Sequence, residues 1–240
     1  KMNKPYQATE VDKAIMQDPE HFRVYDLVSR APAKASYFYN SLTGYHAAKL
    51  KRYNELYDFY ISKNNINVLN MLNTKYIIAE DEEGNPFPYT NPDANGNAWF
   101  VENIKLVNSA NEEILALDSL DTKKEAVMMA ENGYASFLKD DIMIDTTATI
   151  TVEVYEPNYI KYKSKSAVDG FAVFSEIYYK EGWNAYVDGQ LTPYSRVNYV
   201  LRGMNVPAGE HVIEFKFEPE VVKTGSRIAL ASSIIFVLLL

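Results

Sequence analysis

The stretch "KEGWNAYVDG" carries the side chain with the most distinctive chemistry, the indole of Trp183. Sugars stack on such rings because their axial C–H faces are apolar, and planar polar side chains can then bind the hydroxyl groups. Arg196, Asn198 and Arg202 follow on the next predicted strand and could supply those hydrogen bonds. These four residues are candidate glycan contacts. The alternative, which we favour on sequence alone, is that Trp183 closes the edge of a β-sandwich and Asp188 only shapes a hairpin.

A second candidate contact lies in "GYHAAK", where Tyr45 and His46 stand near the start of a predicted helix. The other two histidines, His21 and His211, are far from it in sequence, and none has metal-ligand spacing with a nearby acidic residue. The sequence contains no cysteine and no nucleophile, phosphate-loop or dinucleotide motif. We therefore predict no catalytic residue, no metal site and no cofactor in this chain.

The elements that would hold Trp183 and its neighbours are strands. "TATITVEVYE" alternates apolar and polar residues, and "VDG" is a strong hairpin signal at Asp188 and Gly189. A turn at Pro207 to Gly209 precedes another alternating stretch. Closely spaced strands with such turns are typical of an antiparallel β-sandwich, which we predict over residues 146–225.

Residues 1–145 alternate helices and strands instead. Thr9 is a predicted N-cap, and Ser109 with Glu112 has the capping-box spacing. The clearest helix is expected over residues 41–65, where aromatic and aliphatic residues recur at helical spacing. We also expect a loop over 82–97, which is rich in Gly, Pro and Asn, and a strand over 98–107. The predicted fold class is thus α+β: a mixed α/β domain (1–145) followed by the sandwich.

Composition limits the function classes. Apolar residues make up 47% of the 240-residue chain and charged residues 23%, as in folded globular proteins. The formal net charge of −8 argues against a nucleic-acid partner, which needs a positive surface. Nineteen tyrosines suit half-buried sheet faces or sugar-binding surfaces, and composition does not choose between them.

The last residues, "SRIALASSIIFVLLL", raise the question of location. From Ile228 onward the sequence has no charge and no polar face. As a helix these residues would rise about 20 Å, against about 30 Å for a bilayer core. We therefore expect 226–240 to be the start of a transmembrane helix that continues beyond the chain, which makes the membrane a partner through residues from Ile228 onward. The alternative is a buried element at the end of the domain.

The order of several motifs resembles the extracytoplasmic portion of bacterial YfhO-type membrane proteins, in the form seen in Bacteroidetes-like lineages. The resemblance spans Phe22 to Leu240 and is most specific over 173–219. The stretches that carry it are "FRVYDL", "GYHAAKLKRYNEL", "VLNMLNTKYII", "GNAWFVENIKLV", "FAVFSEIYYKEGWNAYVDG" and "RVNYVLRGMNVPAGEHVIEFKFEP".

This resemblance implies a large polytopic protein similar to glycosyltransferases of the C type, which take sugars from polyprenyl-phosphate carriers outside the cytoplasmic membrane. Some members are linked to glycosylation of envelope polymers such as teichoic acids. The chain would be the part between an N-terminal helix bundle and a last transmembrane helix, facing the periplasm or the extracellular side. The family's catalytic carboxylate is expected in an earlier loop, so no catalytic residue carries over to this chain.

Two functional hypotheses follow. In the first, the chain is accessory to sugar transfer and holds a lipid-linked sugar or an envelope glycan near the membrane. In the second, it is a non-enzymatic interaction or structural domain of a membrane protein. Glycan binding that is lost in Trp183→Ala, with folding intact, would favour the first.

Overall fold

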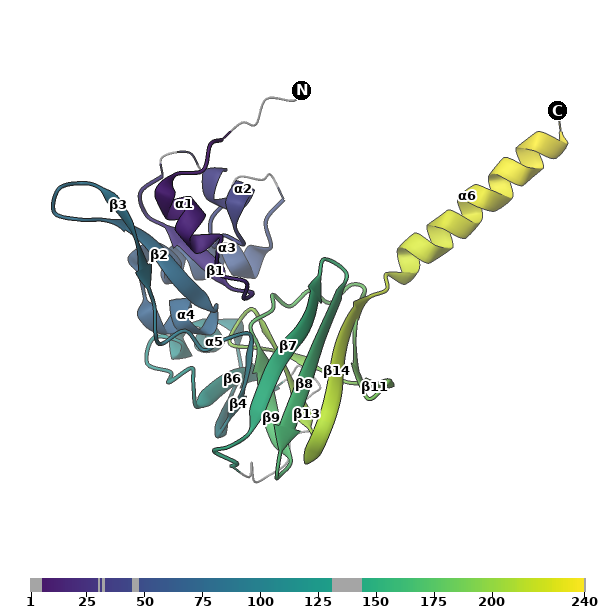
Figure 1. Ribbon diagram of the computed structural model, residues 1–240. Coiled ribbons are helices and arrows are strands. Elements are labelled where there is room, and N and C mark those ends of the chain that lie inside the picture. The colour runs from purple at the N-terminus through teal and green to yellow at the C-terminus, as the bar shows by residue number, and fades with distance from the viewer. Residues whose placement is uncertain (1–5, 30, 32, 45–47, 131–143, 240) are drawn as a thin grey trace.

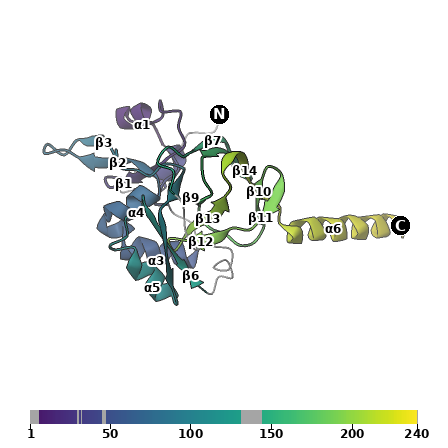
Figure 2. The same cartoon turned by 90° about the horizontal axis from the view of Figure 1, so that it is seen from below.

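The structure, a computed structural model, describes residues 6–29, 31, 33–44, 48–130 and 144–239. Two sheets pack face to face as a sandwich, helices cover the outer face of one of them, and a single long helix projects from the body (Figure 1). Seen from below, α3, α4 and α5 lie on the side of the body opposite to α6 (Figure 2). The predicted α+β fold class, with a sheet-rich C-terminal part and a terminal apolar helix, is confirmed.

The N-terminal part alternates short helices and strands. A three-stranded sheet has the order β1-β2-β3, with β1 parallel to β2, and a separate two-stranded parallel sheet pairs β5 with β6. The elements are α1 (Glu10–Ile15), β1 (Arg23–Asp26), α2 (Lys34–Phe38), α3 (Lys51–Phe59), the 3₁₀ helix η1 (Ile61–Lys63), α4 (Ile66–Met71), β2 (Thr74–Glu80), β3 (Pro86–Thr90), β4 (Ala98–Val101), β5 (Asn103–Val107), α5 (Ala110–Ala116) and β6 (Glu125–Met129).

Both predicted helix starts are confirmed, since Thr9 caps α1 with a capping box and the Ser109 side chain accepts from the Glu112 N–H at the start of α5. The expected helix over 41–65 is shorter. Its described part begins at Lys51 and gives way to η1, which ends where Asn64 takes a left-handed conformation (φ 57°).

Two other expectations about this part were wrong. The expected loop over 82–97 contains β3, which pairs with β2 after a turn at Gly84. Its prolines are tolerated because β3 is an edge strand. The expected strand over 98–107 is two strands broken at Glu102, and each half joins a different sheet.

The sandwich consists of a five-stranded antiparallel sheet, β11-β10-β14-β8-β7, and a four-stranded antiparallel sheet, β12-β13-β9-β4. The predicted domain boundary near Asp145 stays a prediction. The pairing of β4 with β9 joins residues from both sides of that boundary. The remaining strands are β7 (Thr149–Glu156), β8 (Tyr159–Ser166), β9 (Gly170–Phe174), β10 (Trp183–Val187), β11 (Gln190–Thr192), β12 (Ser195–Val197), β13 (Leu201–Val206) and β14 (Gly209–Phe217).

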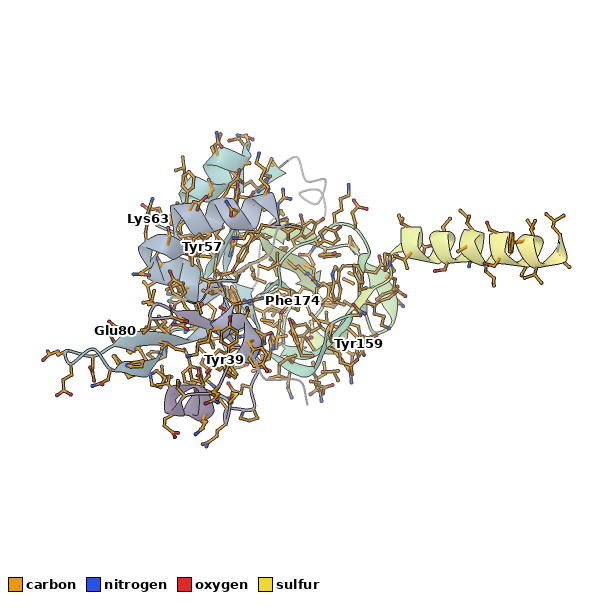
Figure 3. All side chains as sticks on the ribbon, turned by 90° about the horizontal axis from the view of Figure 1, so that it is seen from above. Tyr39, Tyr57, Lys63, Glu80, Tyr159 and Phe174 are labelled. Atoms are coloured by element: carbon orange, nitrogen blue, oxygen red, sulfur yellow. The ribbon has the colours of Figure 1, made fainter. Side chains whose placement is uncertain are left out.

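The four-stranded sheet is the middle layer of the body. One face packs on the five-stranded sheet through a core that includes Phe174, Met204 and Phe215, and Phe174 lies in the interior in Figure 3. The other face packs under α3, α4 and α5 through residues such as Val173 and Leu201. Because both faces are covered, β9 and β13 are nearly continuously buried rather than alternating.

Gly203 in β13 lies at a closely packed point of the four-stranded sheet. An added Cβ would lie 2.7 Å from a ring carbon of Phe171 and 2.9 Å from Val197 Cγ1, closer than real side chains approach. We expect Gly203→Ala to lower the free energy of unfolding by about 1–3 kcal/mol through overpacking. Gly225→Ala is the matched control because nothing lies within 4 Å of its added Cβ. Urea unfolding in a mild detergent measures both, and equal midpoints would contradict the packing argument.

The long helix α6 (Glu220–Leu238) leaves the sandwich directly after β14. It begins six residues before the expected start at 226, after Pro219, and Glu220 in its first turn suits the helix dipole. Its 19 residues rise about 28 Å, close to the thickness of a bilayer core. By length and composition it could cross a membrane, and none of its apolar window is buried against the body.

Candidate functional site

Trp183 and Arg202 come together at the end of the sandwich from which α6 leaves. The guanidinium carbon of Arg202 lies 4.3 Å from the centroid of the Trp183 ring and 4.9 Å from that of Phe215. Arg202 is only 2% exposed, and its Nε and Nη2 donate to the Ile177 carbonyl at 3.4 and 3.3 Å. A cation between two aromatic faces is favourable when it is desolvated. One face of the indole is therefore covered by the protein itself.

Gly182 fixes how Trp183 enters β10. Its φ of +100° is in the region that favours glycine, and an added Cβ would lie 2.9 Å from the Phe217 ring and 3.0 Å from Pro219. The Trp183 and Phe217 rings pack at 5.4 Å between centroids. The indole thus lies against the segment that leads into α6.

Arg196 extends this arrangement. It pairs with Arg202 across β12 and β13, and its guanidinium carbon lies 5.7 Å from the centroid of the Tyr178 ring. Burial lowers the pKa of Arg196 from its ordinary value. The Tyr178 and Tyr194 rings lie 5.5 Å apart. We call Tyr178, Trp183, Tyr194, Arg196 and Arg202 the aromatic–arginine cluster.

Asn198 is not part of this cluster. It is fully buried in a left-handed conformation (φ 48°), where its Oδ1 accepts from the Val127 N–H and its own N–H donates to the Val127 carbonyl, both at 2.8 Å. It therefore ties the sandwich to β6. Tyr45 and His46, the other predicted contacts, lie outside the described residues. A glycan role for all six residues stays a prediction.

The structure also shows a polar pair that the sequence did not indicate. His211 Nδ1 lies 2.6 Å from Asp188 Oδ2, and His211 Nε2 lies 3.0 Å from the Ala208 carbonyl oxygen. Both partners accept, so an imidazolium with two N–H donors satisfies them at once. The hydrogen bond to Asp188 raises the pKa of His211, and the same bond lowers the pKa of Asp188. The pair fixes the β10–β11 turn against β14.

This pair predicts a pH-dependent contribution to stability. Because the folded pKa of His211 is raised, its contribution is present below its unfolded pKa near 6.5 and is lost as the pH rises through the folded value. Half of the Asp188 side chain is exposed, so the effect is below about 1 kcal/mol. We expect urea midpoints to fall more between pH 5.5 and 8.5 in the unmodified protein than in His211→Gln. Parallel midpoints in the two proteins would contradict this.

A second polar group joins β1 to the sandwich. His21 Nε2 and Arg23 Nη2 each lie 4.0 Å from Glu176 Oε1. The Tyr155 hydroxyl donates to Glu176 Oε2 at 3.1 Å. Burial, together with the charge of Arg23, lowers the pKa of His21 to about 4. The imidazole is therefore neutral at pH 7, and Arg23 carries the charge that faces Glu176. These residues come from distant parts of the sequence, and no local sequence motif predicts that they meet.

Metal ligation is not indicated by the described part of the chain, in which no group of three or more His, Cys, Asp or Glu residues is placed to hold an ion. The polar groups above contact one another and backbone groups, but three of their buried nitrogens have no hydrogen-bond partner among the described residues: Arg196 Nε, Asn198 Nδ2 and Arg202 Nη1. Their chemistry is hydrogen bonding and cation–aromatic packing, which can position a polar ligand or hold the body together.

Comparison with known proteins bears on the origin of the chain. Residues 134–229 match the family model described as "Bacterial membrane protein YfhO". No curated protein and no solved structure matches the chain. The matched region contains the sandwich strands from β7 to β14 and the first part of α6. The resemblance predicted from the sequence is therefore confirmed: over residues 134–229 the chain is similar to bacterial membrane proteins of the YfhO type.

Proposed function

We propose that the chain is the body of a YfhO-type protein on the outer side of the bacterial cytoplasmic membrane, held there by α6. We also propose that it is accessory to the transfer of sugars from polyprenyl-phosphate carriers to envelope polymers. The observation that carries the proposal is α6 itself, an apolar helix of membrane-spanning length that no described part of the body covers. The family description supports the membrane location, and the sugar chemistry rests on the resemblance drawn from the sequence.

The arrangement at the start of α6 supports a position at the membrane surface. β14 runs into the helix without a long linker, because only Glu218 and Pro219 separate them. Trp183 and Phe217 lie beside this junction. Tryptophan is enriched at membrane–water interfaces, where an apolar ring and a polar edge are both accommodated.

The test is the sugar content of envelope polymers in cells that lack the gene and in cells complemented with it. We expect deletion to reduce the sugar substituents on at least one polymer, and the unmodified gene to restore them. Unchanged polymer composition in the deletion strain would contradict the role in sugar transfer. The membrane location would then still be judged separately, by fractionation.

One observation favours the second candidate, a structural or interaction domain. Arg202 is 2% exposed and Asn198 is 0% exposed, so their polar groups face the protein interior. If these residues only support the fold, Trp183→Ala lowers stability without changing the sugar content of the polymers. Trp183→Phe is the control, because it keeps an aromatic face for Arg202. Normal polymer sugar content in both variants, measured at a temperature where both are folded, would favour this candidate.

A further inference from the structure

A cleft of about 460 Å³ opens in the sandwich away from the α6 junction. Its floor contains Phe171, Val187 and Val206, all of which are buried. Its rim is polar and comes from three strands, β11, β13 and β14, from the β10–β11 turn and from the residue before β9. The rim residues are Asp169, Asp188, Gln190, Thr192, Asn205 and His211.

The strand register explains why the rim is polar on one side. Gln190 and Thr192 are two residues apart on β11, so they share a face, while Leu191 between them points to the other face and is 70% exposed. Asp188 and His211 are fixed by their own 2.6 Å contact. The Thr192 hydroxyl is held as well, because it donates to the Gln190 carbonyl at 2.9 Å. The rim therefore presents amide, hydroxyl and carboxyl groups above an apolar floor, and several of them are held in place.

These groups indicate the class of ligand. A site with an apolar floor and a few fixed polar groups suits a ligand that has both kinds of surface, as a sugar ring does with its C–H face and its hydroxyl groups. Two acidic side chains, Asp169 and Asp188, face the cleft against one imidazole, His211. This balance disfavours a phosphate group and favours an uncharged saccharide.

The cleft lies far from the membrane surface, where a lipid-linked sugar donor would be found. β14 has nine residues and spans roughly 30 Å, with His211 near its start and α6 following its end. Figure 1 shows α6 projecting from the far end of β14. A sugar on a lipid carrier lies at the membrane surface, whereas a polymer extends away from it and can reach the cleft.

We infer that this cleft binds an uncharged saccharide unit of the acceptor polymer. The inference rests on the proposed function and adds to it a site and a class of ligand. Gln190 and Thr192 are the rim residues to test, because they lie on a short edge strand and are not part of the core.

The experiment measures binding to the full chain in detergent micelles. The probe is the β-1,4-linked tetramer of N-acetylglucosamine, whose amide and hydroxyl groups match the rim. Thr192→Trp places an indole in the cleft, and Leu191→Trp adds the same group to the exposed face of the same strand. We expect saturable binding to the unmodified chain and to Leu191→Trp, and at least tenfold weaker binding to Thr192→Trp. Gln190→Ala, a smaller change, is expected to weaken binding about threefold, with circular dichroism as the check on folding.

Three results would overturn the inference. Equal binding by Thr192→Trp and Leu191→Trp would place the saccharide elsewhere on the body and leave the proposed function standing. Preference for sugar-free poly(glycerol phosphate) over the tetramer would contradict the uncharged class. If the unmodified chain does not bind the tetramer, the cleft is not a site of this class, and the deletion strain then decides separately whether sugar transfer stands.

Discussion

Replacing Arg52 with alanine is expected to lower the free energy of unfolding by about 3–5 kcal/mol, the usual cost of leaving a buried charge without its partner. Arg52 Nη1 donates to Glu113 Oε2 at 2.6 Å, and the Glu113 side chain is 0% exposed. The guanidinium also lies 4.4 Å from the centroid of the Tyr199 ring. A single side chain thus connects α3, α5 and the turn between β12 and β13.

Lys51→Ala is the matched control for this prediction. Lys51 is the neighbouring residue and also forms an ion pair, in which its Nζ lies 3.7 Å from Glu55 Oε1. The Lys51 side chain, however, is 89% exposed. We expect it to contribute less than about 1 kcal/mol. Urea unfolding of both variants in the same detergent gives the comparison. Similar losses in the two variants would contradict the assignment of Arg52 to a buried pair.

The loss of unfolding free energy caused by Arg52→Ala should also depend on pH. Burial raises the pKa of Glu113 even with Arg52 present, and Arg52 opposes that shift. Without Arg52 the pKa of Glu113 rises further, so the carboxyl group takes up a proton more readily as the pH falls. The loss of unfolding free energy on Arg52→Ala is therefore expected to be smaller at pH 5 than at pH 8.

Phe215→Ala is expected to cost a comparable amount, about 3–5 kcal/mol, because a large ring is removed from a closed core. Phe215 is 0% exposed, and its ring lies 5.0 Å from that of Phe174 and 5.5 Å from that of Tyr194, between centroids. It also forms one of the two aromatic faces around Arg202. The substitution therefore leaves a cavity and weakens the packing of a buried cation.

Phe217→Ala provides the comparison for Phe215→Ala. Phe217 lies two residues further along β14 and contacts Trp183, but it is only half-buried. We expect a clearly smaller loss of stability, since less apolar surface returns to water. Unfolding midpoints in urea test this, and equal losses would show that the core does not close around Phe215 as described.

The sequence predicted the features that depend on neighbouring residues. Thr9 and Ser109 were found as helix caps because a cap requires a particular residue type at a fixed short spacing. The alternation from residue 148 predicted β7, and the Asp188–Gly189 pair predicted the β10–β11 hairpin. Each of these signals lies within about ten residues of chain.

Features that depend on distant segments were not predictable in this way. The expected strand at 98–107 divides because β4 pairs with β9 while β5 pairs with β6. β3 forms despite its prolines because β2 offers it an edge. Tertiary pairing overrides local propensity in both cases.

The candidate site shows the same limit. The sequence suggested that Arg202 lies near Trp183, and the two are in contact. It did not indicate that the guanidinium covers a face of the indole, or that Asn198 is fully buried against Val127. The cleft was missed because Gln190 and Thr192 meet Phe171 and Val206 only once the two sheets pack.

We propose that α6 crosses the membrane and carries the body on its outer side. The chain has no cysteine, so single cysteines can be introduced at Leu191, which is 70% exposed on the body, and at Ile234 in the apolar part of α6. The measurement is labelling by a membrane-impermeant maleimide on intact spheroplasts and after solubilisation in detergent. We predict that Leu191→Cys is labelled in intact spheroplasts, whereas Ile234→Cys is protected until detergent is added. Labelling of Leu191→Cys only after lysis would contradict the outer location of the body, and labelling of Ile234→Cys as fast as Leu191→Cys in intact spheroplasts would contradict the membrane-spanning position of α6.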